Sequence, residues 1–425
     1  MERGKEKMKK RRRILSLVFA ACLVITGIVS GAGVQKAEAA ARTEVIDVTD
    51  YGVYPDSGKD SAIGIQKAIA AAKDATKEGK EVKINFPEGR YDIYPDKAIE
   101  RELYVSNTVG ADQNNKMKKI GIFLEDMDHV TVDGNNSLFM FHGKMTTFAT
   151  IGCEDVEFKN FAVDFQVPTV IDMTVESVEG NTATMYIPEC YNYEVAGTTI
   201  KWYSDVSPYT GQRYWSISDL SGYHTQREDT VQGIKFGAGN GNAALKGVAS
   251  IEDLGNHRVK ITYNSKAGEV QNGMCFQSRP TVRDHAGTFF WKSKDIKMTS
   301  LDIQFLHGFG MVGQHSENIT MEDVDFEAPK ESGRTTAGYA DFVQMSGCKG
   351  AININNCTFA GPHDDPINIH GTFNTVTSIS SDRRTITVQY NHHETAGFPN
   401  FFEGDEIEFM TKGNMITVEN SVRTV

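Results

Sequence analysis

The chain has 425 residues and a formal net charge of −12, from 44 lysines and arginines against 56 aspartates and glutamates. With 40% hydrophobic and 24% charged residues the composition is ordinary and globular, which excludes a disordered chain or a multi-span membrane protein. The acidic balance argues against nucleic acid as a partner, because phosphate binding needs clustered lysine and arginine.

The first 39 residues have the pattern of an export signal. A basic run ends at Arg13, an apolar stretch extends from Ile14 to about Val34, and Ala37-Glu38-Ala39 offers small residues for cleavage. A membrane anchor is the alternative, because the stretch is nearly long enough to span a bilayer. A lipoprotein site at Cys22 is disfavoured, because apolar residues continue past it. We expect cleavage, no membrane span afterwards, and a secreted or cell-surface protein.

One helix is expected near the start of the mature chain. Residues 61–73 place Ile65, Ala68, Ile69 and Ala72 on one face, the spacing of an amphipathic helix. Asp60 or Ser61 can cap its first turn. Such a helix could cover the open end of a stack of strands and remove an exposed edge.

A short apolar-alternating pattern, followed by a polar pair that can turn the chain, recurs along the sequence. Strands that recur at a period in the twenties, with no amphipathic helix between them, predict a parallel β-helix in which successive coils stack. The copies are Val130–Asn135, Val156–Phe161, Ile296–Leu301, Ile319–Val324 and Ile352–Cys357.

Three hairpin-like copies interrupt or follow this pattern. They begin at Val175, Val248 and Val376, and each has a polar turn and a second strand. We therefore expect an all-β protein: a right-handed parallel β-helix with an inserted, small β-barrel-like module and a second, incomplete one at the C-terminus. The expected organisation is a signal peptide at 1–39, an N-terminal β-helix part with the capping helix at 40–170, the inserted module at 171–285, a C-terminal β-helix part with the active site at 286–372, and the incomplete module at 373–425.

Three carboxylates fall at matching places in neighbouring repeats. Counted from the start of its repeat, Asp364 lies at position 12 and Asp365 at position 13. Asp341 reaches position 12 if about ten residues around 330–338 form an insertion, and His307 lies one coil earlier at position 11. Equivalent positions on adjacent coils are about 4.8 Å apart. The spacing predicts a column of His307, Asp341 and the Asp364-Asp365 pair.

Such a column suits glycoside hydrolysis, in which one carboxyl protonates the leaving oxygen and another activates water. Stacked aspartates can also be turn ladders or calcium ligands, and these alternatives remain open. Further candidates for substrate binding near the column are His363, His370, Tyr339 and Arg334. For Arg334, a charged side chain in a solvated loop is an equally good alternative. Five cysteines follow the signal without a Cys-x-x-Cys pair, so we expect no zinc and at least one unpaired thiol.

The sequence resembles a known family at two places. Asp50-Tyr-Gly-Val, the helix segment and Ile84–Tyr91 are similar to the opening of pectin-lyase-like β-helix enzymes. Gly338–Phe342 and Gly361–Gly371 resemble the bacterial α-1,3-galactosidases that cleave the blood-group B antigen, glycoside hydrolase family 110. The resemblance implies an exo-acting enzyme that acts on terminal α-galactose with inversion and without cofactor or metal.

The same resemblance implies residue roles. The family's proposed catalytic carboxylates match Asp341, Asp364 and Asp365. A similar arrangement in polygalacturonases implies that Asp364 is the general acid and that Asp341 and Asp365 hold the attacking water. Two other functions remain open: a pectin-type polysaccharide hydrolase or lyase, and a non-catalytic carbohydrate-binding β-helix. Anionic pectin fits poorly with a mature net charge of −18, which follows from the loss of nine basic and three acidic residues with the signal.

Overall fold

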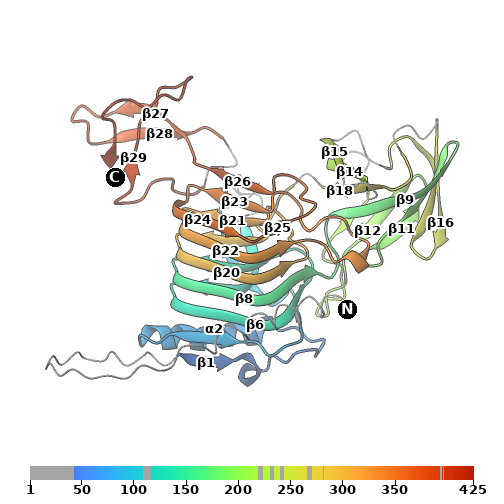
Figure 1. The fold of residues 1–425 in the computed structure, drawn as a ribbon, viewed down its shortest axis with the longest axis horizontal. Coiled ribbons are helices and arrows are strands. Elements are labelled where there is room, and N and C mark those ends of the chain that lie inside the picture. The colour runs from blue at the N-terminus through green and yellow to red at the C-terminus, as the bar shows by residue number, and fades with distance from the viewer. Residues whose placement is uncertain are drawn as a thin grey trace, which may run out of the picture. The chain divides into compact units, whose positions relative to one another are not determined.

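The computed structural model describes residues 43–108, 116–218, 224–229, 234–239, 244–265, 270–280, 282–392, 395 and 397–425. The expected signal peptide lies outside the described residues, as does Cys22. In the described part the chain is mostly β, with two parallel sheets whose strands stack one above the other and several antiparallel sheets (Figure 1). No helix among these residues is long and apolar enough to cross a membrane.

The first parallel sheet carries the sequence repeats. Its strands follow one another in the order β1 (Glu44–Asp47), β2 (Val82–Asn85), β6 (Asp128–Phe141), β8 (Glu154–Phe165), β20 (Lys294–Ile303), β22 (Glu317–Phe326) and β24 (Lys349–Asn355), with β3 (Arg90–Ile93) and β25 (Thr358–Phe359) beside β6 and β22. The predicted repeat starts are direct partners across this sheet: Val130, Val156, Ile296, Ile319 and Ile352. The repeats and their register are confirmed.

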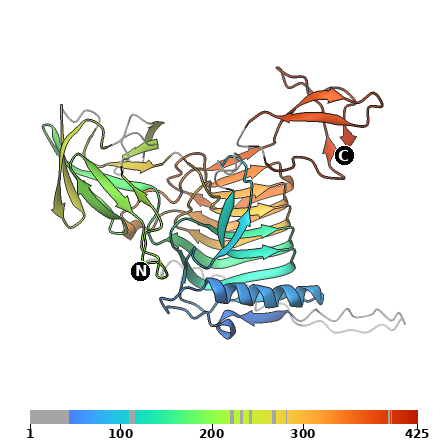
Figure 2. The ribbon, with the colours of Figure 1, turned by 180° about the vertical axis from the view of Figure 1, so that it is seen from behind.

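The second parallel sheet lies opposite, and the chain visits the two sheets in turn (Figure 2). Its order is β5 (Met117–Glu125), β7 (Thr146–Ile151), β19 (Thr288–Trp291), β21 (Met311–Gln314), β23 (Val343–Ser346) and β26 (Ile367–His370), with β4 (Ile99–Glu102) antiparallel at the edge. A single hydrophobic core fills the space between the sheets, with phenylalanines stacked from coil to coil.

The polar pairs after each repeat bend the strand. Their second residues, Asn160, Ser300, Asp323 and Asn356, all have φ between 53° and 57°, in the left-handed region. Asparagine and aspartate tolerate this conformation better than most side chains. The turn predicted from the polar pair is therefore present at the same place in four successive coils.

Helix α2 (Ala62–Lys77) packs beneath the first strands and buries Ile65, Ala68, Ile69 and Ala72, as predicted. The side chain of Asp60 caps it, because Asp60 Oδ1 accepts the backbone N–H of Ala62 at 2.9 Å; Ser61 makes no such bond. The short 3-10 helix Val48–Tyr51 precedes it.

Antiparallel strands occupy the region between β8 and β19. Seven of them form one sheet. All three hairpins predicted from the sequence are present: Val178 lies opposite Ala183, Ile251 opposite Ile261 and, near the C-terminus, Val376 opposite Val388. The strands are β9 (Ile171–Glu179), β10 (Thr182–Tyr186), β14 (His224–Asp229), β15 (Ile234–Gly239), β16 (Val248–Gly255), β17 (Arg258–Tyr263) and β18 (Met274–Arg279), with β11 (Asn192–Ala196), β12 (Thr199–Tyr203) and β13 (Ser216–Ile217) in a smaller sheet and β27 (Asn374–Ile379), β28 (Ile386–Tyr390), β29 (Glu406–Ile407) and β30 (Arg423–Thr424) at the end.

This region has a hydrophobic core of its own, in which Trp202 and Trp215 are buried. A separate core supports a separate module, although the predicted domain boundaries stay predictions. The five described cysteines form no disulfide with one another.

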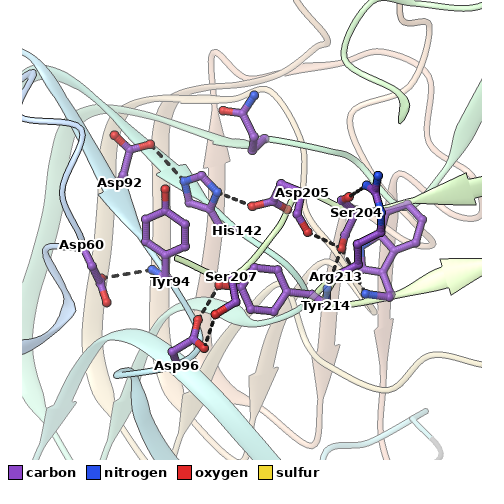
Figure 3. A network of polar contacts seen from close by, with 12 residues as sticks. Asp60, Asp92, Tyr94, Asp96, His142, Ser204, Asp205, Ser207, Arg213 and Tyr214 are labelled. Carbon is purple, nitrogen blue, oxygen red and sulfur yellow. Dashed lines mark hydrogen bonds and ion pairs between the residues drawn. The ribbon is translucent and has the colours of Figure 1, made fainter. Parts of the chain in front are cut away.

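A buried histidine joins the inserted strands to the first coil (Figure 3). His142, just after β6, contacts Asp92 of β3 through Nε2 at 3.0 Å and Asp205, after β12, through Nδ1 at 2.6 Å. Two carboxylate partners are satisfied best when both ring nitrogens carry protons. Burial lowers the pKa of His142, but the two carboxylates raise it more, so the pKa lies above its ordinary value. The ring of Tyr94 stacks on the imidazole at 3.7 Å between centroids.

Replacement of His142 by alanine should lower the free energy of unfolding by about 3 kcal/mol at pH 6, because it leaves Asp205 without its cation and Asp92 with Arg90 alone. Since the pKa of His142 is raised on folding, its stabilisation is complete below about pH 6.5 and fades as the pH rises through the raised value. Urea unfolding of both proteins between pH 6 and 9 measures this. The control is His129→Ala, which removes an exposed pair with Asp155 and should cost no more than about 1 kcal/mol. Equal pH dependence in wild type and His142→Ala would contradict the assignment.

Candidate active site

Three carboxylates from two successive coils converge at one end of the second sheet. Asp341 lies two residues before β23, and Asp364 and Asp365 lie just before β26. The backbone N–H of Phe342 donates to Asp365 O at 3.0 Å, which extends the pairing of the two strands to this point. One oxygen from each of the three carboxylates lies within 4.8 Å of the others. The structure thus brings the three aspartates together, while their catalytic role stays a prediction.

The predicted register of the column was wrong by one residue. Val343 pairs with Ile367, so Asp341 is level with Asp365 and not with Asp364. Ile303 pairs with Phe326, and Met311 pairs with Val343, so the two intervals are equivalent. The first interval is eight residues long and the second is seventeen, so the insertion has nine residues and not ten. The same shift places His307 level with Tyr339, next to the bridge between Leu306 and Gly338.

The three carboxyls differ in burial, and this separates their chemistry. Asp341 is 2% exposed, whereas Asp364 and Asp365 are exposed. Burial raises the pKa of Asp341 to about 6, with a further contribution from the negative charge of Asp364. The amide of Asn368 opposes this shift, as it donates to Asp341 Oδ2 at 3.2 Å and to Asp365 Oδ2 at 3.3 Å. Asn368 therefore links Asp341 and Asp365 as a pair and leaves Asp364 apart.

The inserted strands hold the loop that carries Asp364 and Asp365. Arg279, at the end of β18, donates from Nε to His363 Nδ1 at 3.0 Å, and His363 Nε2 donates to Gln277 O at 3.2 Å. Both side chains are buried, and the guanidinium of Arg279 also lies 4.7 Å above the ring of Tyr339. With both nitrogens engaged, His363 supports the position of the neighbouring Asp364. Sequence analysis missed Arg279, because no pattern in the sequence reveals that β18 meets this loop.

His307 and Tyr339 lie behind the carboxylates. His307 is fully buried; its Nε2 contacts Asp284 Oδ1 and its Nδ1 contacts Thr169 Oγ1, each at 2.6 Å. Burial lowers the pKa of His307 to about 4, so the ring is neutral near pH 7. Its ring packs 5.1 Å from that of Tyr339, whose hydroxyl donates to Pro280 O and Val282 O. These contacts fix the segment that leads from β18 to β19.

Two predicted site residues make contacts with groups other than the three carboxylates. Arg334 is 7% exposed and forms a two-bond ion pair with Asp164 at 2.9 and 2.8 Å, so the alternative of a solvated loop charge is wrong. His370 ends β26, five residues past Asp365, which at the rise of a strand is about 17 Å. Its Nδ1 contacts Gly371 O at 3.0 Å. His370 therefore lies at the far end of β26 from the three aspartates, and Arg334 is engaged by Asp164; a role of either residue in substrate binding stays a prediction.

Among the residues that the structure describes, two groups of side chains have the spacing of metal ligands: Asp284 with His285 and His307, and the three aspartates. The first fits a cation poorly, because Lys144 donates to Asp284 Oδ2 at 3.1 Å and Lys118 donates to Asp284 O at 2.5 Å. The second offers only carboxylate oxygens, which suit calcium or magnesium. The calcium alternative for the three aspartates is therefore chemically reasonable and needs a direct test.

Comparison with known proteins confirms the resemblance seen in the sequence. The chain is 43% identical to "Alpha-1,3-galactosidase A" of Streptomyces avermitilis over 391 residues, 91% of this chain and 61% of that protein. It is 31% identical to the protein of that name from Bacteroides fragilis, over 88% of this chain and 59% of the relative. The chain thus spans about three fifths of the length of these relatives. No family model matches it.

Solved structures give only a distant likeness. A hyperthermoactive exopolygalacturonase from Thermotoga maritima is 11% identical, with a TM-score of 0.29 over 78% of this chain and 56% of that one.

The electrostatics of the site predict opposite effects of two substitutions. Asp364→Asn removes a negative charge that raises the pKa of Asp341, so that pKa should fall from about 6. Asn368→Ala removes a donor that lowers it, so the pKa should rise. Titration of aspartate carboxyl carbons by ¹³C NMR, with Asp341→Asn to assign the signal, measures both shifts. Shifts of the same sign in the two variants would contradict this account of the site.

Proposed function

We propose that the protein is an exported, exo-acting glycoside hydrolase that removes terminal α-1,3-linked galactose from blood-group-B-type or linear α-galactosyl glycans with inversion. The convergence of Asp341, Asp364 and Asp365 carries this proposal. The names of the curated relatives support the linkage, although the chain spans only part of their length. The pattern of residues 1–39 supports export.

We also infer that the two parallel sheets are walls of a right-handed parallel β-helix. The alternation of the chain between the sheets, in register over successive coils, supports this architecture. The strands of 171–285 would then be a module inserted between two coils, and those after 373 a second, incomplete one. In this arrangement the inserted module forms one side of the active site through β18.

The proposed mechanism assigns a different task to each carboxyl. Asp341 and Asp365, linked by Asn368, bind a water molecule and accept its proton as the water oxygen attacks the anomeric carbon. Asp364 takes up a proton before the reaction and donates it to the glycosidic oxygen as the bond to the anomeric carbon breaks. A pKa of about 6 makes Asp341 a stronger base than an ordinary aspartate while it is still mostly ionised at pH 7.

The spacing of the carboxylates is also compatible with a retaining mechanism, which therefore needs a test. Inverting enzymes commonly separate their two carboxyl groups by about 6.5–9.5 Å and retaining enzymes by about 5–5.5 Å. Oxygens within 4.8 Å are closer to the second range. A water held directly between two carboxylates explains the short distance with inversion, whereas an aspartate nucleophile explains it with retention.

Proton NMR during cleavage of an α-1,3-linked galactoside decides between them. Inversion predicts that β-galactose appears first and then mutarotates; α-galactose as the first product indicates retention. Branched B-type and linear substrates should be tested side by side. Sugar binding without release of galactose from either substrate would instead support the non-catalytic alternative.

Leaving-group dependence tests the separate roles. Asp364→Asn should lose at least about 10²-fold in kcat on a natural galactoside, yet retain much more activity on an aryl galactoside whose leaving group needs no proton. Asp341→Asn should lose both activities, and added azide should restore part of its turnover by replacing the activated water. The reverse pattern would exchange the two assignments. Unchanged melting temperatures would show that the folds are intact.

Treatment with EDTA tests the calcium alternative. If the three aspartates act directly on substrate, dialysis against EDTA should leave kcat and KM unchanged, and added calcium should have no effect or inhibit. Loss of activity that calcium restores would identify the aspartates as cation ligands.

A further inference from the structure

A cavity of about 780 Å³ lies away from the three carboxylates, between the first coils and the inserted strands. Its volume falls within the range of about 300–1,000 Å³ that is usual for small-molecule sites. Figure 3 shows part of its wall, including the stacked Tyr94 and His142. The residues that line it include Tyr94, His142, Gln166, Glu189, Asn192 and Arg213.

The cavity and the carboxylates are separate places on the stack. Tyr91, Phe139, Val163, Ile303, Phe326 and Phe359 are successive partners across six strands. Gln166 follows the third of these strands and Asp364 follows the sixth, so three coil spacings, about 14 Å, separate them. None of the three aspartates lines the cavity.

Most charges in the cavity wall are compensated within the wall. His142 binds Asp92 and Asp205, and Arg90 also binds Asp92 and donates to Gln166. Arg213 donates to Ser204 O and brings a positive charge, and Asp56 and Glu189, the latter between β10 and β11, each bring a negative one. Its four carboxylates, Asp56, Asp92, Glu189 and Asp205, outnumber Arg90, Arg213 and the protonated His142 by one, so the wall does not attract an anion.

Several polar groups of the wall are left to meet a ligand. Among the residues that the structure describes, the Tyr94 hydroxyl, the Glu189 carboxylate and the Asn192 amide have no hydrogen-bond partner. They combine donors and acceptors around a half-buried aromatic ring, one face of which His142 covers. Hydroxyl groups on a small carbon skeleton match such a set, because each hydroxyl can donate and accept.

We propose that this cavity is a second carbohydrate-binding site, which takes a neutral saccharide and carries out no chemistry on it. The site goes beyond the proposed hydrolysis and does not depend on it. A protein that binds glycan here keeps a glycan chain near its surface, while the carboxylates about 14 Å away act on a terminal sugar.

Calorimetric titration with lactose, a neutral disaccharide without an α-linkage, tests the proposal. The double variant Glu189→Ala/Asn192→Ala removes side chains that stabilise nothing else in the described structure, so the fold should persist. It should bind lactose at least 10-fold more weakly than wild type, with unchanged kcat on a small α-galactoside. The matched control is Glu179→Ala, an exposed carboxylate outside the cavity, which should change neither.

Two outcomes would overturn the proposal. One is lactose affinity in the double variant equal to that of wild type, particularly if Asp364→Asn abolishes binding, because the sugar would then occupy only the carboxylate site. The other is tighter binding of galacturonate or galactosamine than of lactose, because the wall would then select charge. Activity and lactose binding are separate readouts, so failure of the second site leaves the test of the hydrolase intact.

Discussion

The register between stacked strands is the constraint on which the site depends. Each coil is joined to the next by backbone hydrogen bonds, and its side chains alternate between core and solvent, so a slip of one residue would expose an entire apolar row. The partners Val156, Ile296 and Ile319 show that this register persists across the inserted strands, which occupy more than a hundred residues between the first and second of them. Aspartates far apart in sequence are placed side by side because their coils cannot slip.

Burial then gives three chemically identical side chains different properties. Asp341 sits at the inner side of the group, where loss of solvent and the nearby charge of Asp364 raise its pKa to about 6. Asp364 and Asp365 lie on a loop whose conformation is held by Arg279 and His363. The inserted strands therefore contribute to the site by supporting the loop, and their own core is built around Trp202 and other residues that do not reach the carboxylates.

Much of the fold could be predicted because alternation of apolar side chains is a local signal. The repeat starts, the bend at Asn160 and its equivalents, helix α2 and three hairpins were all visible in the sequence. The register of Asp341 was misjudged by one residue, since the length of a loop insertion leaves no local pattern. Arg334 and His370 were placed near the site by proximity in sequence, but a buried partner, Asp164, holds one and the direction of β26 removes the other. Asn368 was overlooked although it lies three residues after Asp365.

The most direct measurement is a crystal structure of the Asp364→Asn variant with an uncleaved α-1,3-linked galactoside. The account predicts the glycosidic oxygen within about 3 Å of the side chain at position 364, with the anomeric carbon facing the pair formed by Asp341 and Asp365. A terminal galactose bound elsewhere, or one whose anomeric carbon contacts none of these three residues, would contradict it.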